Sequence, residues 1–205
     1  MDETSDTYKT LKKPSEEILF KEKKSKFFGY AFPIHTEDEV KPIIENLKKK
    51  HNTANHVCYA WQLGTKTIAY RANDDGEPNN SAGMPIYGQI QSFEVTNVLV
   101  AVVRIFGGTK LGVGGLISAY KTGAQLALEN AEIIEKTIQI HFLLAFEYAD
   151  MDKVMRIIKQ ENLDIITQEM ALNCKITIAV RENDAEKIQT IFEAFYGVEI
   201  SETDL

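Results

Sequence analysis

The sequence predicts an α+β protein built from two domains. Segments with the residue patterns of strands and helices alternate along the chain, and residues 138–203 show them in the order β-α-β-β-α-β, which is that of a ferredoxin-like domain. The charge balance also changes: residues 1–135 carry 16 Lys and Arg against 17 Asp and Glu, whereas residues 136–205 carry 7 against 13. We therefore expect a polar leader over 1–17, a first domain over 18–135 and a second over 136–205.

The first elements are a strand pair and a helix. The leader, MDETSDTYKTLKKPSEE, has no apolar signal-peptide core. Residues 18–34 predict two strands joined by the basic turn KEKKSK. Residues 36–51 predict a helix, because Thr36 can cap it, acids fill its first turn, and lysines 48–50 lie near its negative C-terminal end.

A hairpin is expected next. Residues 55–64 alternate in polarity, and residues 67–72 follow after a short GTK turn. This pattern predicts two paired strands with one apolar face and one mixed face. On the mixed face we expect His56 and Arg71 side by side. If residues 97–106 join the same sheet, Arg71 and Arg104 would line one mixed surface.

The rest of the first domain predicts a helix, a strand and a second helix. Residues 84–96 predict a helix with Pro85 in its first turn. Residues 97–106, NVLVAVVRIF, are nearly all apolar, which is typical of a central buried strand. Residues 116–132 predict the second helix. The joint ENAEIIEKT contains neither Pro nor Gly, so we expect this helix to run almost directly into the second domain.

The segment 107–115, GGTKLGVGG, is a glycine loop between the predicted strand and the helix. Two interpretations remain open for it. Backbone N–H groups at a helix N-terminus, together with Lys110, suit phosphate or another anion. Alternatively, the glycines only allow a tight connection to pack closely. The pattern matches neither GxxxxGK[ST] nor GxGxxG, so a P-loop and a dinucleotide site are not supported. The residues concerned are Gly107, Gly108, Lys110, Gly112, Gly114 and Gly115.

The segment 74–86, DDGEPNNSAGMPI, is an acidic loop with several possible roles. Its three carboxylates could bind a divalent cation or do acid/base work, but no EF-hand spacing or partner nucleophile accompanies them. The loop could instead be structural, with turns and caps made by its small and acidic residues. Its carboxylates could also pair with Lys110 or Arg104 and so brace both loops. The residues concerned are Asp74, Asp75, Gly76, Glu77, Pro78, Ser81 and Gly83.

Composition excludes several classes of protein. Hydrophobic content of 44% and charged content of 26% are typical of a globular chain, and no apolar run approaches the roughly 20 residues of a membrane helix. Cys58 and Cys174 lie far apart, which argues against a disulfide framework or a cysteine-based zinc site and favours a reducing cytoplasm. Neither half is strongly basic, so an avid nonspecific nucleic-acid binder is not expected, although local basic patches remain open.

Four segments resemble the Impact/YigZ family: KKSKFFGYAFPI, NHVCYAW, DDGEPNNSAGMPI and VVRIFGGTKLGVGGLISAY. The likeness spans about residues 18–130, and residues 138–203 resemble the extra C-terminal domain of the bacterial, YigZ-like members. The resemblance implies a first domain like the second domain of a small-subunit ribosomal protein and domain four of elongation factor G. It implies a second domain like domain five of the same factor. Eukaryotic members of the family regulate translation by interfering with activation of an amino-acid-starvation kinase.

The family signature can be placed on this chain position by position. Two departures occur, Asn80 where the family usually has glycine and Ser81 where it usually has threonine. A third position, Met84, is often basic in the family. The matching positions are Asp74, Asp75, Gly76, Glu77, Pro78, Ala82, Gly83, Pro85, Ile86, Arg104, Phe106, Gly107, Gly108, Lys110, Leu111, Gly112, Gly114, Gly115, Leu116, Ala119 and Tyr120.

Two functional hypotheses follow. The first is a non-enzymatic binding or regulatory protein associated with translation, which contacts RNA, the ribosome or a protein partner through the two loops. Its binding residues would be Arg71, Arg104, Lys110 and the loop glycines, beside the acidic loop, with no resident metal or cofactor. The alternative is an enzyme acting on a phosphorylated or anionic small molecule, with a metal held at the acidic loop. Fold analogy alone does not decide between them.

Overall fold

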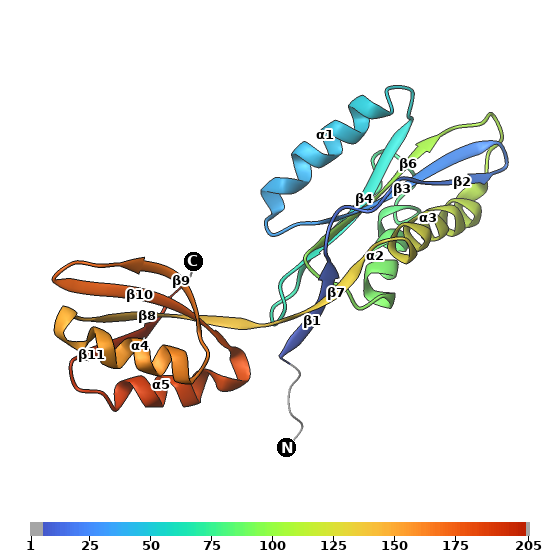
Figure 1. Ribbon diagram of the computed structural model, residues 1–205. Helices are drawn as coiled ribbons and strands as arrows, with labels where there is room; N and C mark the ends of the chain where they lie inside the picture. The colour runs from blue at the N-terminus through green and yellow to red at the C-terminus, as the bar shows by residue number, and fades with distance from the viewer. Residues whose placement is uncertain (1–5, 204–205) are drawn as a thin grey trace, which may run out of the picture. The chain divides into compact units, whose positions relative to one another are not determined.

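The structure is a computed structural model in which residues 6–203 are described. Within the described part, the chain forms two compact units: the first is Tyr8–Lys136, and the second contains residues 137–203 together with Asp6 and Thr7 (Figure 1). Each unit has its own hydrophobic core. No helix among residues 6–203 is long and apolar enough to cross a membrane.

The first unit is built on a five-stranded sheet in which every neighbouring pair is antiparallel. The apolar run predicted to be a central strand forms β6 in the middle of this sheet, where the side chains from Val98 to Val103 have no exposed surface. The strands, in the spatial order β2-β3-β6-β4-β5, are β2 (Ile18–Glu22), β3 (Ser25–Pro33), β6 (Val98–Ile105), β4 (His56–Leu63) and β5 (Ala69–Asn73).

Helices cover both faces of this sheet (Figure 1). The chain enters α1 through the short helix η1 (Glu37–Glu39), where the backbone N–H of Thr36 donates to Glu39 Oε1 at 2.9 Å. One face packs against α1, and the other packs against α2 and α3. The helices are α1 (Val40–Lys50), α2 (Gly83–Ser92) and α3 (Gly112–Glu129).

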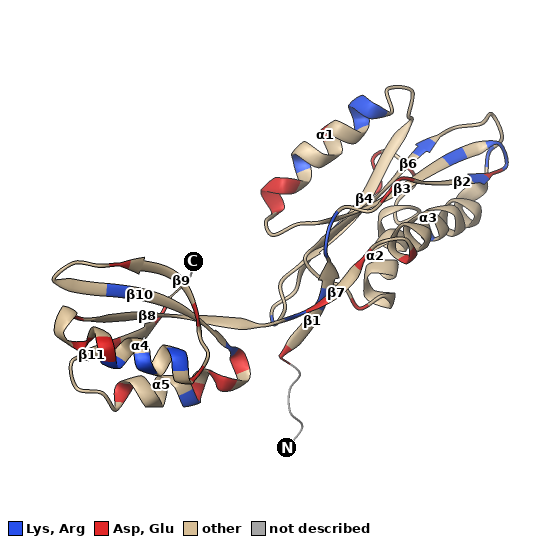
Figure 2. Ribbon diagram, viewed as in Figure 1, with Lys and Arg blue, Asp and Glu red and all other residues tan. Residues whose placement is uncertain are grey.

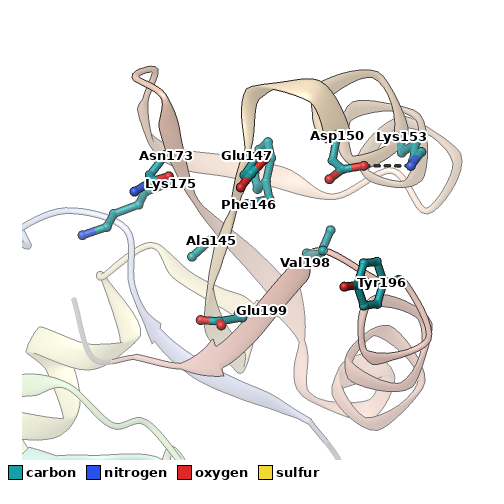
Figure 3. A pocket seen from close by; sticks show the side chains of 11 residues that line it. Ala145, Phe146, Glu147, Asp150, Lys153, Asn173, Lys175, Tyr196, Val198 and Glu199 are labelled. Carbon is teal, nitrogen blue, oxygen red and sulfur yellow. Dashed lines mark hydrogen bonds and ion pairs between the residues drawn. The ribbon is translucent and has the colours of Figure 1, made fainter.

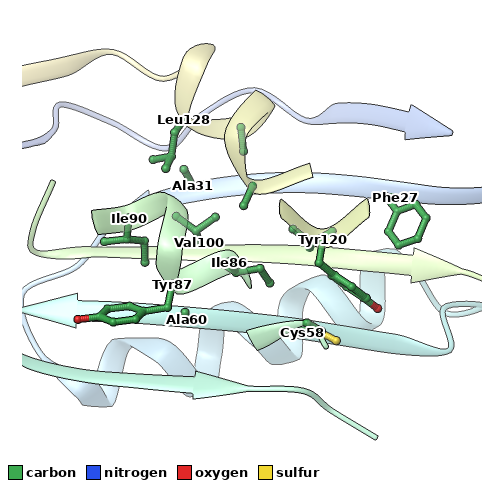
Figure 4. Packing of buried hydrophobic residues seen from close by; sticks show 14 of the residues in the cluster. Phe27, Ala31, Cys58, Ala60, Ile86, Tyr87, Ile90, Val100, Tyr120 and Leu128 are labelled. Atoms are coloured by element: carbon green, nitrogen blue, oxygen red, sulfur yellow. The ribbon is translucent and has the colours of Figure 1, made fainter. Parts of the chain in front are cut away.

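Small residues bring α3 close to the sheet. Cys58 and Ala60 face α2 and α3, where bulkier side chains from the helices fill the space (Figure 4). At the closest approach, a Cβ atom on Gly29 would lie 2.4 Å from the carbonyl oxygen of Gly123. Any larger residue at Gly29 would therefore push α3 off the sheet.

The prediction that Arg71 lies on the same face of the sheet as His56 is wrong. Arg71 pairs across the sheet with Trp61, and Trp61 faces α1. His56 pairs with Arg104 on the opposite face, because residues 56 and 61 are an odd number of positions apart on one strand. Arg71 and Arg104 consequently do not share a surface.

The polar leader and the domain joint also differ from expectation. Within the leader, β1 (Thr7–Leu11) forms a strand, and it pairs with β7 (Ile133–Thr137) in a two-stranded sheet. The buried Leu11 joins the core of the first unit, which supplies the apolar contact that holds this strand. The helix α3 ends at Glu129 and β7 follows it, so the helix does not run into the second unit. The leader residues 1–5 lie outside the described part.

The second unit has the predicted β-α-β-β-α-β order. Its four-stranded antiparallel sheet has the spatial order β11-β8-β10-β9. Both helices contribute to one core with the alternate, inward-facing residues of the strands. A buried Asp6 is bound by Arg181, whose Nη2 donates to Asp6 Oδ1 at 2.8 Å. The elements are β8 (Gln139–Glu147), η2 (Tyr148–Asp150), α4 (Met151–Gln160), β9 (Asp164–Glu169), β10 (Asn173–Arg181), η3 (Glu182–Asp184), α5 (Ala185–Glu193) and β11 (Val198–Glu202).

Candidate functional site

The acidic loop is held in place by its own carboxylates, beginning with Asp74. Its side chain accepts the backbone N–H groups of Asn80, Ala82 and Gly83 at 2.9, 2.9 and 2.8 Å. These contacts cap the N-terminus of α2, where backbone donors lack intrahelical partners. Asn80 has a left-handed φ of 59°, which asparagine tolerates better than most residues, so the turn survives without glycine. Ser81 donates to the carbonyl of Pro78 at 2.6 Å.

Asp75 ties the loop to the sheet and to α1. Its carboxylate accepts the backbone N–H of Val57 at 2.7 Å and the Nζ of Lys48 at 3.0 Å. Its carbonyl accepts a hydrogen bond from His56 Nδ1 at 2.8 Å. Asp75 and Gly76 both adopt positive φ, 40° and 89°, so the chain turns sharply here.

Glu77 is the carboxylate that joins the acidic loop to β6 and α3, the elements on either side of the glycine loop. It is buried, and its Oε1 accepts hydrogen bonds from Arg104 Nη1 at 2.6 Å and from the Tyr120 hydroxyl at 2.8 Å. The side chains of Glu77 and Arg104 are 4% and 8% exposed. His56 Nε2 lies 3.9 Å from the same oxygen. Of the roles left open for the acidic loop, the pairing of one of its carboxylates with Arg104 is therefore observed.

Arg104 is further enclosed by aromatic rings. Its Cζ lies 5.7 Å from the ring centre of Phe27 and 5.4 Å from that of Phe106. Both distances suit cation–π attraction. Its Nε is buried and has no hydrogen-bond partner among the described residues. Such a donor is uncommon in a folded protein.

The buried Cys58 thiol lies beside this group. Its Sγ donates to the carbonyl of Asp74 at 3.0 Å. Burial raises the pKa of Cys58, which keeps the thiol protonated and therefore a poor nucleophile. Burial also raises the pKa of Tyr120, so its hydroxyl stays a donor to Glu77. Both groups therefore stay protonated, and their hydrogen bonds stabilise the junction between the acidic loop and the sheet.

The glycine loop has geometric reasons for most of its glycines. A Cβ on Gly107 would lie 2.0 Å from the backbone of Lys24, in the turn between β2 and β3. Gly108 and Gly112 have φ of 87° and 74°, values that favour glycine. A Cβ on Gly115 would meet Leu111 at 2.9 Å. Around Gly114, by contrast, a Cβ would find nothing within 4 Å, so packing does not explain this residue.

A pocket of about 430 Å³ lies between the two loops. Phe106, Leu111, Val113 and Leu116 supply most of its apolar wall. The lining also includes Asn55, His56, Glu77, Pro78, Arg104, Lys110 and Gly112. The site is therefore an apolar hollow with charged groups at its margin, and we call it the two-loop pocket.

The predicted site residues divide into three groups. Glu77, Pro78, Arg104, Lys110 and Gly112 line the two-loop pocket. Asp74, Asp75, Gly76, Ser81 and Gly83 shape the acidic loop behind it, while Gly107, Gly108, Gly114 and Gly115 belong to the glycine loop and the first turn of α3. Arg71 lies elsewhere and pairs with Glu37 at 3.4 Å.

Sequence reasoning did not assign Phe106 and Val113 to the site. Their side chains are 41% and 54% exposed. Both flank the glycines of the loop, and large apolar residues exposed there are the signal that identifies them.

Lysines gather near the same end of the sheet (Figure 2). Lys23 and Lys24 form the left-handed turn between β2 and β3, and the Ser25 hydroxyl that follows accepts the backbone N–H of Gly107 at 3.2 Å. Lys26 lies opposite Ile105 in the register of β3 and β6. These lysines are exposed, so the turn places a local basic patch beside the glycine loop.

The second unit contains another hollow, of about 710 Å³ (Figure 3). Its lining mixes acids and bases from β8, β10, β11 and the start of α4, and an ion pair joins Asp150 to Lys153 at 2.7 Å. Tyr196 at its rim is 99% exposed. The charged lining residues are Glu147, Asp150 and Glu199 against Lys153 and Lys175, so acids and bases are mixed, with one acid in excess.

The fold and the two-loop pocket define a two-unit α+β protein with a ligand-sized site between two loops. The pattern of the Impact N-terminal domain matches residues 23–128. The chain is 32% identical over 148 residues to IMPACT family member YvyE of Bacillus subtilis (strain 168), covering 72% of this chain and 68% of that protein. It is 31% identical to IMPACT family member YigZ of Escherichia coli (strain K12), covering 72% and 73%.

The chain therefore belongs to the Impact family, and the resemblance predicted from its four segments is confirmed. A solved structure titled as that of a hypothetical protein is similar to this one, with a TM-score of 0.72. The match covers 97% of this chain and 98% of the chain in that structure. At 23% identity this likeness supports the two-unit fold alone.

Proposed function

We propose that the protein is a non-enzymatic binding protein associated with translation, which contacts the ribosome, its RNA or a protein partner through the two-loop pocket. Family membership supports the link to translation, through the role that the resemblance implies for eukaryotic members. The observation that carries the location is the Glu77–Arg104 pair, because it anchors the acidic loop to the end of β6, where the glycine loop begins and the hollow lies. The site would act in the cytoplasm.

The fold analogy belongs to the same proposal. The strand order β11-β8-β10-β9 supports a ferredoxin-like second domain over 136–205. The sheet of the first unit, covered on both faces, supports the domain over 18–135 and its likeness to domain four of elongation factor G. A protein with both likenesses would suit a contact with the ribosome.

The basic patch beside the glycine loop supports the same contact. Lys23, Lys24 and Lys26 are exposed on the turn that touches Gly107, and Lys110 is exposed on the loop itself. Cations at a loop surface attract phosphate groups, and this attraction weakens as salt is added. Binding through this surface should therefore depend on ionic strength.

Co-sedimentation with intact ribosomes at two salt concentrations tests the proposal. We expect the full chain to co-sediment at low salt and to dissociate at higher salt. Lys110→Gln should weaken binding, whereas Lys121→Gln, which changes an exposed lysine further along α3, should not. Labelled ribosomal RNA serves as a second target. Failure to bind ribosomes and RNA at low salt would reject the proposal.

The enzymatic alternative would require the acidic loop to hold a metal. The oxygens of Asp74 and Asp75 instead accept backbone N–H groups and a lysine, and Glu77 is engaged by Arg104 and Tyr120. These contacts favour bracing over metal binding, since a cation would have to replace them. Calorimetry with Mg²⁺ and nucleotides, with Lys110→Ala as the control, tests this alternative.

A further inference from the structure

We propose that the two-loop pocket binds an apolar carboxylate, meaning a carboxylate group carried on a compact apolar body such as a leucine side chain. The proposal rests on the proposed function for the place of contact and adds the chemistry of what is bound there. Two sources share this chemistry: a free small acid and the C-terminal residue of a polypeptide.

The first turn of α3 provides the donors for the carboxylate. An α-helix leaves its first four N–H groups without intrahelical partners, and Leu111, which precedes α3, has no polar side chain to accept them. Gly112 lines the pocket, and nothing would crowd a Cβ on Gly114, so the backbone here is open to a ligand. A helix N-terminus of this kind favours an anion.

A buried donor gives an independent indication of a ligand. Arg104 lines the pocket with a side chain that is 8% exposed, and its Nε has no partner among residues 6–203. Leaving such a donor unsatisfied is costly in free energy, and an oxygen acceptor removes that cost. The exposed ring of Phe106 lines the same pocket, with its centre 5.4 Å from the Cζ of Arg104.

The charges around the pocket favour a ligand that carries a single negative charge. Arg104 is balanced by Glu77 at 2.6 Å, which leaves Lys110 and the helix N-terminus as the uncompensated positive groups. A carboxylate supplies one negative charge to match them. A phosphate monoester carries about −1.5 to −2 at neutral pH and would bring surplus negative charge close to Glu77.

The walls of the pocket select an apolar body. Phe106, Leu111, Val113 and Leu116 line it, and Phe106 and Val113 leave large parts of their side chains exposed to water. Covering apolar surface of this kind drives binding. The volume of about 430 Å³ falls within the roughly 300–1,000 Å³ typical of small-ligand sites.

Calorimetry on the full chain tests the proposal with matched probes. The probes are N-acetyl-leucine, its uncharged amide, a short peptide ending in leucine, the same peptide amidated, and inorganic phosphate. We expect each acid to bind at least about tenfold more tightly than its amide, since hydrogen bonds to charged groups are worth more than neutral ones. Lys110→Gln and Val113→Ser should each weaken binding of the acids, and Lys121→Gln should leave it unchanged.

Each outcome decides a part of the question. Tighter binding of the peptide acid than of N-acetyl-leucine identifies a chain end as the source, and tighter binding of N-acetyl-leucine identifies a free acid. Equal binding shows that the carboxylate and the leucine side chain, which both sources share, are sufficient. Equal affinity for acid and amide, displacement by phosphate, or no binding of any acid overturns the proposal. If ribosome binding still depends on Lys110 while the acids fail to bind, the proposed function stands and only this proposal fails. If neither interaction is found, both fail.

Discussion

Replacing Glu77 by glutamine should strongly destabilise the first unit. Glutamine keeps the shape of the side chain but removes its charge, which leaves the guanidinium of Arg104 buried without a counter-ion. Breaking a buried ion pair in this way typically costs about 3–5 kcal/mol. The Tyr120 hydroxyl would keep an acceptor in the glutamine carbonyl, so the loss is due to the charge. We therefore expect the free energy of unfolding to fall by roughly 3–5 kcal/mol.

The single tryptophan of the chain makes this measurable. Trp61 lies buried in β4, within the same sheet as Arg104, so its fluorescence reports unfolding of the first unit. Urea denaturation of the wild type and of Glu77→Gln gives the difference, and Glu45→Gln, at an exposed position on α1, is the matched control. The variant Glu77→Gln/Arg104→Met should recover much of the loss, because it removes the unpaired charge. A loss below about 1 kcal/mol, equal to that of the control, would refute the reasoning.

Three further predictions concern stability. Asp74→Ala should lower the free energy of unfolding by about 1–2 kcal/mol, because it removes the side-chain cap of α2; Asp74→Asn, which keeps an acceptor, should lose less in the same urea titration. Gly107→Ala should be destabilising and Gly114→Ala tolerated, since only the first Cβ would collide with backbone, and thermal unfolding of the two variants should separate them. Burial lowers the pKa of His51 below its usual 6.5, so His51 adds stability that is present above pH 6.5 and is lost as the pH falls from 6.5 through the lowered pKa of the folded state. The urea midpoint of His51→Gln should therefore change less than that of the wild type between pH 7.5 and pH 5.5, and equal changes would contradict this assignment.

Much of the fold was predictable because its signals are local. The apolar run of β6, the alternation of β4 and the capped entry to α1 each depend on a few neighbouring residues. The strand β1 was missed because TYKTL is short and becomes a strand only through pairing with β7, more than a hundred residues away. Contacts of that range leave little trace in a local pattern.

The site was predictable in part for the same reason. Pairing of the acidic loop with Arg104 was one of the roles that its sequence left open, and the structure shows the Glu77–Arg104 contact. The face of Arg71 did not follow, because it depends on the pairing register of β4 and β5, and a shift of one residue turns a side chain to the other face. The pocket itself depends on how α3 packs on the sheet, which no single motif encodes.

Hydrogen exchange on the protein bound to ribosomes tests the central claim most directly. The account predicts that, relative to the free protein, backbone amides of the glycine loop and the first turn of α3 become protected, around Lys110 and Gly112. Peptides from the second unit should change less. Protection confined to the second unit, or a glycine loop that exchanges equally fast in the free and bound protein, would contradict the claim that the two-loop pocket is the binding site.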